Sequence, residues 1–543
     1  MGTLAGELGL RAGEHPDRTF VSFPDLDLSY AEFHRRAVAL AKGLIAVGLR
    51  PGGHVAVLMT NSPTYVELVF GVQLAGGVVV PLNARFKRRE LSYVLGRCDA
   101  EILVTTDAVD EHTDFTALVA ASLPGLRLAE HTEGAAGAVV APGAPRLRRI
   151  HLDGDKDVPF AAPLTALVAA GRDVPDDAVV AASAGRTAED PAVLLYTSGT
   201  TADPKGCELT HRALIGSWSA FADVVGLRGG EAMWTPCPFF HVGGIGPTVS
   251  ALVRGAEVMS MGHFDPEVAL DHLERRHAEH LFPAFPPLTL GLLRTPGYDR
   301  DRLRAVRTVL NVAPRETQEM IQQLLPETAV LLTDFGMTEG AGMITTTTLD
   351  EPERDRLGRN GRPIPGIEVR ITDPGEPATV VPVDTPGEIQ FRGVNAFRAY
   401  YRDPEATAET ILPGGWVRTG DSGSVNANGS LLFLGRTKDV LKVGGENVSP
   451  LEVEAYLSTH PAVRMAQVVG RPSERYGEEP VAFVELSGGA DCTADELIAF
   501  CRGSLASYKV PREVRFVTSW PMSATKIQKF RLRAMLEDDL APR

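Results

Sequence analysis

The segment that most constrains this chain is a run of hydroxyl residues around a glycine and a lysine. Residues 196–206 read Tyr-Thr-Ser-Gly-Thr-Thr-Ala-Asp-Pro-Lys-Gly, and the apolar run 192–195 before them has the length of a buried strand. Glycine lets backbone N–H groups turn toward an anion, serine and threonine add hydroxyl donors, and Lys205 adds a positive charge. Because the lysine precedes the last glycine and no serine or threonine follows it, this is not the nucleotide-triphosphate P-loop. The segment predicts a phosphate-binding turn after a strand, with an ordinary polar turn as the alternative.

Composition argues against several classes of function. The net charge of −15 over 543 residues argues against nucleic-acid or anionic-membrane binding. The five cysteines are scattered, which fits a reducing cytoplasm better than a disulfide framework or a zinc site. No apolar run is long enough to span a bilayer, and the N-terminus lacks the apolar core of a signal peptide. We therefore expect a soluble, cytoplasmic protein of more than one domain.

The N-terminal part has the pattern of an α/β protein. Residues 1–105 alternate helix and strand patterns, with Ser29 as a helix N-cap and buried strands at 55–59 and 76–82. From about 106 to 190 the sequence is rich in Ala, Gly, Pro and Asp. We expect a peripheral, partly irregular region there, without catalytic residues.

Two further segments place glycines beside groups that suit a ligand. Residues 233–246 carry aromatic residues, the lone His241 and three glycines, which suit the wall of a pocket, although a lone histidine is more often structural. Residues 333–340 read Thr-Asp-Phe-Gly-Met-Thr-Glu-Gly and follow the apolar strand 329–332. They put an aromatic ring, a hydroxyl and a carboxylate at the carboxyl end of a strand, where α/β sheets bind ligands. A carboxylate beside a phosphate site acts through a cation, usually Mg²⁺.

A domain boundary is expected near residue 438. Asp421 ends a strand pattern and could take the hydroxyls of a ribose, and 435–439 break the apolar strand 431–434. A glycine-marked loop then leads to a helix that begins after Ser449. Because the residues beyond it have their own core pattern, we expect two domains, residues 1–437 and 438–543.

In spacing as well as in residue type, these segments resemble the adenylate-forming superfamily of acyl-CoA synthetases, firefly-luciferase-like enzymes and peptide-synthetase adenylation domains. Seven segments match in order, over nearly the whole chain: 196–206, 238–243, 335–339, 387–393, 416–421, 435–454 and 521–529. The resemblance implies an α/β fold. A large N-terminal domain would contain α/β subdomains with parallel-rich sheets flanked by helices, plus a β-barrel-like part. A small, mobile α+β domain would follow at the C-terminus.

The resemblance also assigns roles. The N-terminal domain would bind ATP and the acid, and the C-terminal domain would carry the catalytic lysine, Lys526, with Lys438 at the hinge. Thr338 would contact the α-phosphate and Glu339 would hold Mg²⁺, so both count as catalytic with Lys526. The residues expected to bind ATP or AMP are Thr197, Ser198, Gly199, Thr200, Thr201, Lys205, Ala313, Asp334, Phe335, Gly336, Thr338, Asp421 and Arg436.

The implied reaction is that of an acid–CoA ligase. A carboxylate and ATP give acyl-AMP and pyrophosphate, after which CoA takes the acyl group and AMP leaves. The residues expected to contact CoA are Arg85, Gly444, Gly445, Tyr476, Tyr508 and Arg512. The expected acyl pocket is walled by His241, Val242, Gly243, Asn311 and Val312. Because 239–241 hold no acid to pair with an α-ammonium group, we expect a fatty, aromatic or alicyclic acid rather than an α-amino acid.

Two other functions stay open at this point, as does a homodimer. In one, acyl-AMP passes to the thiol of a carrier protein. In the other, the chain binds nucleotide without catalysis, although retention of Lys526, Glu339, Asp421 and Arg436 argues against it. The chain departs from the family pattern at Ala202, Asn311-Val312, Thr333, Asp334, Phe335 and Thr525. Substrate size and nucleotide affinity are therefore not predicted.

Overall fold

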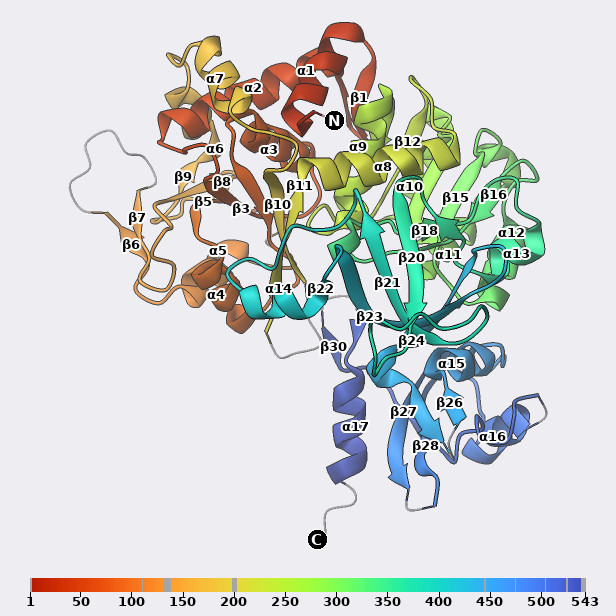
Figure 1. The fold of residues 1–543 in the computed structure, drawn as a ribbon. Helices are drawn as coiled ribbons and strands as arrows, with labels where there is room; N and C mark the ends of the chain where they lie inside the picture. Colours follow the sequence, from red (N-terminus) through yellow and green to blue (C-terminus); the bar gives the residue numbers. More distant parts are fainter. Residues whose placement is uncertain are drawn as a thin grey trace.

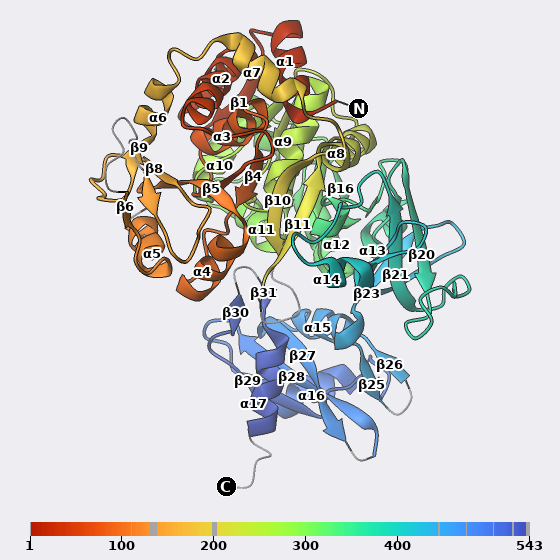
Figure 2. The ribbon, with the colours of Figure 1, turned by 60° about the vertical axis from the view of Figure 1, so that its left-hand side comes forward.

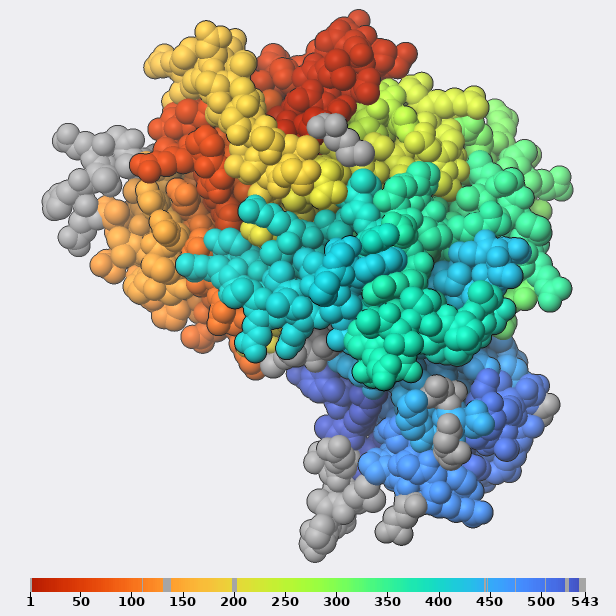
Figure 3. Space-filling view, in the orientation of Figure 1, coloured from red at the N-terminus to blue at the C-terminus, as the bar shows by residue number. Residues whose placement is uncertain are grey.

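The protein consists of a large α/β part and a smaller α+β part at its C-terminal end (Figure 1). The computed structural model describes residues 2–109, 111–129, 138–197, 203–443, 446–473, 475–502, 504–523 and 526–538. The smaller part lies below the larger one as a separate body, and helix α17 (Lys529–Asp538) projects from it (Figures 1 and 3). Within these described ranges, no helix is both long and apolar enough to cross a membrane.

Two mostly parallel sheets form the large part. In the first, the described strands run in the order β16-β15-β14-β12-β13-β1-β2, and β2 is antiparallel to its neighbour. In the second they run in the order β11-β10-β4-β3-β5-β8-β9, and β11 is antiparallel. The first sheet contains β1 (Thr19–Phe23), β2 (Leu26–Ser29), β12 (Ala232–Trp234), β13 (Glu257–Met259), β14 (His280–Ala284), β15 (Thr308–Asn311) and β16 (Val330–Leu332). The second contains β3 (His54–Leu58), β4 (Val78–Pro81), β5 (Ala100–Thr106), β8 (Arg149–Asp153), β9 (Ala162–Pro163), β10 (Pro191–Thr197) and β11 (Lys205–Thr210).

Helices connect the parallel strands, as right-handed crossover units require. The helices of the large part are α1 (Leu4–Glu14), α2 (Tyr30–Ala46), α3 (Pro63–Leu74), α4 (Arg88–Arg97), α5 (Phe115–Ser122), α6 (Leu164–Ala170), α7 (Asp176–Ala184), α8 (His211–Val225), α9 (Val242–Arg254), α10 (Pro266–Arg276), α11 (Pro286–Leu293), the 3₁₀ turn η1 (Arg300–Leu303), α12 (Arg315–Leu324), α13 (Glu353–Gly358) and α14 (Pro404–Thr410). Ser29 caps α2 as predicted, because its hydroxyl accepts from the Glu32 amide. α3, α8 and α9 are buried along most of their length, and their residues share one core cluster with residues of both sheets.

Antiparallel sheets complete the large part. One contains β17 (Asp334–Phe335), β18 (Thr345–Thr346) and β19 (Arg362–Pro363), and the 3₁₀ turn η2 (Thr338–Gly340) follows β17. The other contains β20 (Ile367–Thr372), β21 (Gly387–Gly393), β22 (Ile411–Leu412), β23 (Trp416–Val425) and β24 (Leu431–Arg436). This second sheet is the β-barrel-like part that the resemblance implied. A short ribbon of β6 (Arg127–Leu128) and β7 (Val139–Val140) lies beside the start of β8, where the Val139 amide donates to the Arg148 carbonyl at 2.8 Å.

The C-terminal part has its own cores. It contains η3 (Thr437–Asp439), β25 (Leu441–Val443), β26 (Glu446–Val448), α15 (Pro450–Ser458), β27 (Val463–Ser473), β28 (Gly477–Leu486), α16 (Ala494–Arg502), β29 (Glu513–Phe516), β30 (Met522–Ser523), β31 (Lys526–Ile527) and α17. The core clusters of the large part draw on residues up to Leu431, and the two C-terminal clusters draw on residues from Leu441 onward. Among the described residues, these clusters do not mix across η3.

The α/β prediction is confirmed, but the expected irregularity of 106–190 is wrong in part. β8 and β9 do lie at the edge of the second sheet, which agrees with a peripheral position. The region also forms the helices α5, α6 and α7. These helices are short and rich in alanine, so the 3.6-residue period that marks an amphipathic helix is weak in their sequences.

Candidate active site

The described ends of the predicted phosphate-binding segment belong to the strands β10 and β11. Thr197, the last residue of β10, pairs with Lys205, the first residue of β11. Ser198, Gly199, Thr200 and Thr201, together with Ala202, lie outside the described residues. The Lys205 ammonium group lies 5.0 Å from the centre of the Tyr400 ring, a distance at which a cation and an aromatic face attract.

A segment just before α14 runs beside β11 and brings Tyr400 to this hairpin. The Glu208 amide donates to the Ala399 carbonyl at 3.0 Å, and the Tyr401 amide donates to the Gly206 carbonyl at 2.7 Å. These bonds make the segment a short antiparallel extension of β11, in which Tyr400 stands opposite Cys207. The position of Tyr400 therefore follows from strand pairing rather than from neighbours in the sequence.

Glu339 also contacts Tyr400. The Tyr400 hydroxyl donates a hydrogen bond of 2.7 Å to Glu339 Oε1, and the Phe397 amide donates to the Glu339 carbonyl at 2.8 Å. Burial raises the pKa of Tyr400 above its ordinary value, so its hydroxyl remains a donor at neutral pH. Lys205 and Glu339, which come from distant segments, thus converge on one side chain that sequence reasoning missed. The signal was weak: an aromatic cluster, 397–401, before the helix that begins after Asp403.

The predicted adenine and ribose residues lie on three strands that meet at the β23–β24 pair. The Phe335 ring lies 5.4 Å from the Phe433 ring, and Phe433 belongs to β24. Arg436, at the end of β24, pairs across the sheet with Asp421, and Arg436 Nε lies 3.1 Å from Asp421 Oδ1. The structure therefore brings Phe335, Asp421 and Arg436 to the same strand pair. Gly336 is exposed beside Phe335, and Thr338 is half-buried.

Trp218 of α8 fixes the loop that follows η2. Its indole N–H donates to the Ala341 carbonyl at 2.8 Å, and its side chain is 1% exposed. A Cβ atom built on Gly246 of α9 would lie 1.8 Å from the indole ring, so glycine is needed for this close approach. The sequence did not single out Trp218, because nothing near it distinguishes it from a core aromatic residue.

The residues expected to wall the acyl pocket are only partly brought together. His241 is the N-cap residue of α9, and Val242 and Gly243 form its first turn. Asn311 is fully buried at the end of β15, where its amide oxygen accepts from Thr289 at 2.7 Å and its amide nitrogen donates to Gln318 at 3.3 Å. These contacts hold the Asn311 amide among α11, α12 and β15. The backbones of Val312 and Ala313 follow at the same strand end, and both residues are half-buried.

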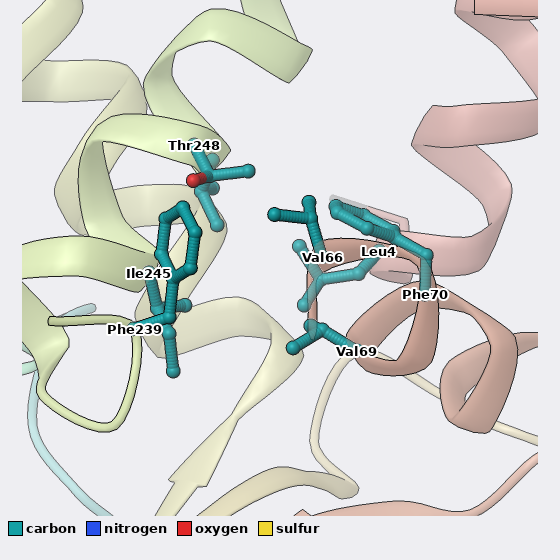
Figure 4. A pocket seen from close by; sticks show the side chains of 8 residues that line it. Leu4, Val66, Val69, Phe70, Phe239, Ile245 and Thr248 are labelled. Atoms are coloured by element: carbon teal, nitrogen blue, oxygen red, sulfur yellow. The ribbon is translucent and has the colours of Figure 1, made fainter. Parts of the chain in front are cut away.

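A small apolar cavity lies between α3 and α9 (Figure 4). It is lined by Leu4, Val66, Val69, Phe70, Phe239, Ile245, Thr248 and Val249. Its volume of about 10 Å³ is at the lower limit for a single water molecule, and its walls are almost entirely carbon. We regard it as a packing void rather than an acyl pocket.

Asp334 is a buried acid without a cation. It is 6% exposed, and its Oδ1 atom has no hydrogen-bond partner among the described residues. Burial raises its pKa from 3.8 to about 7. Asp334 was expected among the residues that bind ATP or AMP and as a departure from the family pattern, and its sequence neighbours give no reason for its burial.

As the pH rises from 5 to 7, we expect the melting temperature of the wild type to fall relative to that of Asp334→Asn. The folded pKa of about 7 lies above the unfolded value of 3.8, so the folded protein holds the proton more tightly. The free energy of unfolding of the wild type therefore falls through this window and levels off above it, whereas asparagine does not titrate. Differential scanning fluorimetry of both proteins at several pH values measures this difference, with Glu316→Gln on exposed α12 as the control. Parallel melting curves at every pH would contradict the burial argument.

Three of the residues expected to contact CoA gather on the C-terminal part. The Arg512 guanidinium lies 5.5 Å from the centre of the Tyr476 ring, and Tyr508 packs against the same core cluster as Tyr476. Arg85 is exposed on the large part, before α4. Gly444 and Gly445 lie outside the described residues.

The predicted catalytic lysine lies in the β30–β31 hairpin. Ser523 and Lys526 are paired in this hairpin, whereas the Lys526 side chain and Thr525 lie outside the described residues. The hairpin lies on the side of the large part where β10 and β11 end (Figures 1 and 2). Lys438 lies in η3, and its neighbour Asp439 forms an ion pair of 2.7 Å with Arg533 of α17. That contact between the expected hinge and the last helix was not predicted.

Comparison with known proteins gives consistent matches over the whole chain. Residues 10–401 match the family described as AMP-binding enzyme, and residues 452–526 match the family described as AMP-binding enzyme C-terminal domain. A putative acyl-CoA synthetase of Bacillus subtilis is 32% identical over 98% of this chain and 96% of its own length. A feruloyl-CoA synthase of Amycolatopsis is 33% identical over 96% of this chain and 97% of its own. The crystal structure of ATP-bound MatB from Rhodopseudomonas palustris matches with a TM-score of 0.82 and 27% identity, covering 99% of this chain and 100% of that one.

Proposed function

The chain belongs to the family of AMP-binding enzymes, and we propose that it works as an ATP-dependent acid–CoA ligase of the AMP-forming type. The reaction joins a carboxylate to AMP with release of pyrophosphate, and then transfers the acyl group to the thiol of CoA with release of AMP. Relatives named acyl-CoA and feruloyl-CoA synthetases, aligned over nearly their full length, support this reaction.

One observation supports the site assignment more than any other. Lys205 and Glu339, a cation and an acid from distant segments, both contact Tyr400. A cation suits the phosphate oxygens of ATP, and an acid in the same place suits a metal ion bound to those oxygens. We infer that Lys205 binds ATP phosphates and that Thr197 and 198–201 complete the cradle. Phe335 would stack on adenine, and Asp421 with Arg436 would bind the ribose.

The residues near Glu339 fit Mg²⁺. Oε1 of Glu339 accepts one hydrogen bond from Tyr400, which leaves the rest of the carboxylate for a hard cation. Among the described residues, no group of three or more His, Cys, Asp or Glu side chains could hold a metal. A single carboxylate with phosphate and water oxygens is the usual arrangement for Mg²⁺ at a nucleotide. When bound, the ion neutralises charge on the phosphate oxygens.

The first half-reaction depends on positioning and electrostatics. The carboxylate of the acid is already ionised at neutral pH, so it needs no base, but it must approach an anionic phosphate. We infer that Lys526 relieves this repulsion at the α-phosphate and that the Thr338 hydroxyl orients the α-phosphate. Lys205 stabilises the charge on the leaving pyrophosphate.

The second half-reaction requires a different arrangement of the C-terminal part. We propose that residues 438–543 rotate about Lys438, withdrawing Lys526 and presenting Gly444 and Gly445 to the thiol of CoA. The separate core clusters on the two sides of η3 support such a hinge. Tyr476, Tyr508 and Arg512 would bind CoA on the small part and Arg85 on the large part.

The cellular location and the acid are further proposals. We propose a cytoplasmic enzyme that acts in acid metabolism on a fatty, aromatic or alicyclic acid. The predominantly apolar residues around Val242 and Trp218 support such an acid.

A panel of carboxylic acids tests the reaction. Purified enzyme, ATP and Mg²⁺ are incubated with each acid, and pyrophosphate and AMP are measured with and without CoA. We expect pyrophosphate release with a subset of acids and AMP release that depends on CoA. AMP release unchanged by CoA but increased by a phosphopantetheinyl carrier protein would favour the carrier-loading alternative. If no acid supports exchange of pyrophosphate into ATP, the proposed reaction is wrong.

A further inference from the structure

The Asp334 carboxylate lies on the surface that joins the predicted nucleotide site to the predicted acyl pocket. A Cβ atom built on Gly336 would lie 1.7 Å from the Gly342 carbonyl oxygen and 3.3 Å from Asp334 Oδ2. A Cβ atom on Gly342 would in turn lie 2.8 Å from Trp218 Cζ2 and 3.1 Å from Val242 Cγ2. Asp334, the Gly342 backbone, Trp218 and Val242 therefore form one continuous wall.

This wall belongs to the acyl side rather than to the adenine side. Successive strand residues point to opposite faces, so Asp334 faces away from Phe335, which packs on Phe433 of β24. Gly336 itself is exposed, and a Cβ atom at its position would meet the Gly342 carbonyl oxygen and the Asp334 carboxylate, so only a glycine leaves room between them. Across the strand pair Asp334 lies opposite Thr346 of β18, and the Gly342 backbone beyond its carboxylate leads to the Trp218 indole ring and Val242.

One oxygen of the Asp334 carboxylate lacks a partner among the described residues, although the carboxylate also accepts a hydrogen bond from its own backbone N–H. Its Oδ1 atom is buried without a hydrogen-bond partner, and no described lysine or arginine pairs with it. The Thr333 hydroxyl, the preceding side chain, is also buried without a partner among the described residues. Burial of an unpaired carboxyl group is unfavourable, and a ligand that supplies the missing donor recovers that free energy on binding. Asp334 Oδ1 is thus an unpaired acceptor beside the Gly342 backbone, close to the apolar side chains of Trp218 and Val242.

We propose that Asp334 selects carboxylic acids that carry a hydrogen-bond donor, a hydroxyl or an amino group, on the acyl part of the molecule. The proposal rests on the acid–CoA ligase function and adds the substrate class. Apolar contact with Trp218 and Val242 holds the carbon skeleton, and the donor on the acid binds Asp334. A site that hydrogen-bonds a substrate group discriminates strongly against analogues without it, because its own polar atom would stay unpaired.

The test uses acids matched in shape. Methyl-, hydroxy- and aminobenzoates, with the substituent at each ring position, are compared with methyl-, hydroxy- and amino-substituted butanoates by pyrophosphate exchange into ATP. In the wild type we expect kcat/KM for the best donor-bearing acid to exceed that of its methyl analogue by about 10-fold or more. In Asp334→Ala this ratio falls below threefold or inverts, because the methyl analogue now meets an apolar wall.

Two further variants separate the effect of the Asp334 charge from that of its shape and provide a control. Asp334→Asn keeps the shape of the side chain and one acceptor oxygen, so the enzyme should still prefer hydroxy acids over their methyl analogues. Its preference for acids with an ammonium group should be lost, because the negative charge is removed. This variant also serves if Asp334→Ala fails to fold, as judged by its melting temperature. Glu316→Gln, an exposed carboxylate change on α12, leaves the ranking unchanged.

The outcomes separate this proposal from the proposed function. If methyl analogues are the better substrates of the wild type, or if Asp334→Ala and Asp334→Asn both leave the ranking unchanged, the role of Asp334 is overturned while the ligase function stands. If no acid supports exchange, the ligase function is overturned, and the role of Asp334 with it.

Discussion

Lys526→Ala is expected to lower the rate of acyl-adenylate formation by about 100-fold or more while leaving ATP affinity within about threefold. The reason is that the lysine would act where charge develops, at the α-phosphate, whereas ATP is held by residues of the large part such as Lys205, Phe335 and Asp421. Pyrophosphate exchange into ATP measures the first quantity, and a fluorescent ATP analogue or calorimetry measures the second. When supplied with preformed acyl-AMP and CoA, the variant should still release AMP, because the lysine has no part in the thiol transfer.

Arg464→Ala provides the matched control. Arg464 is a surface cation of the C-terminal part, and its guanidinium pairs with Glu485 at 2.7 Å with 68% of its side chain exposed. Loss of that charge should leave both half-reactions within twofold of wild type. Normal exchange in Lys526→Ala would remove the lysine from the mechanism. An equal loss in both half-reactions would instead indicate that the C-terminal part had lost its structure.

Patterns local in sequence predicted the two sides of the site but not the contact between them. The strands 192–195 and 329–332, and the hydroxyl- and glycine-rich turns after them, are short-range signals, and β10 and β16 lie where those signals placed them. Tyr400 could not be found in this way, because its role comes from the pairing of its segment with β11 and from a contact with Glu339. A tyrosine before a capped helix has many ordinary explanations in sequence alone.

Buried residues without a distinctive sequence pattern were the second group of site residues that the sequence did not predict. Trp218 packs against Gly246 and donates to the Ala341 carbonyl, yet in the sequence it is one more apolar residue of an amphipathic helix. Its close contact with Gly246 depends on how α8 crosses α9, and no local pattern specifies such a crossing. Asp334 was recognisable as an unusual charge, but its burial and its missing partner are tertiary properties.

Glu339→Gln is expected to lower the rate of acyl-adenylate formation by about 100-fold or more and to raise the Mg²⁺ concentration needed for ATP binding. The amide keeps the size of the side chain but removes the negative charge that would hold the ion. Calorimetry of ATP binding at a series of Mg²⁺ concentrations gives a readout independent of turnover. ATP binding with an unchanged Mg²⁺ dependence would show that Glu339 does not hold the metal.

Tyr400→Phe separates the position of the Glu339 carboxylate from its charge. This variant loses the hydrogen bond of 2.7 Å but keeps the ring beside Lys205, so we expect a smaller loss, about 5- to 20-fold, and the same direction of change in Mg²⁺ dependence. In the Glu339→Gln background the same substitution should have little further effect, because two groups that act through one hydrogen bond are not additive. Tyr401→Phe is the matched control, since the neighbouring hydroxyl donates to Asp99 Oδ2 at 2.8 Å, away from Glu339. Additive losses in the Tyr400 and Glu339 double variant would mean that Tyr400 supports the fold of the hairpin and does not orient the carboxylate.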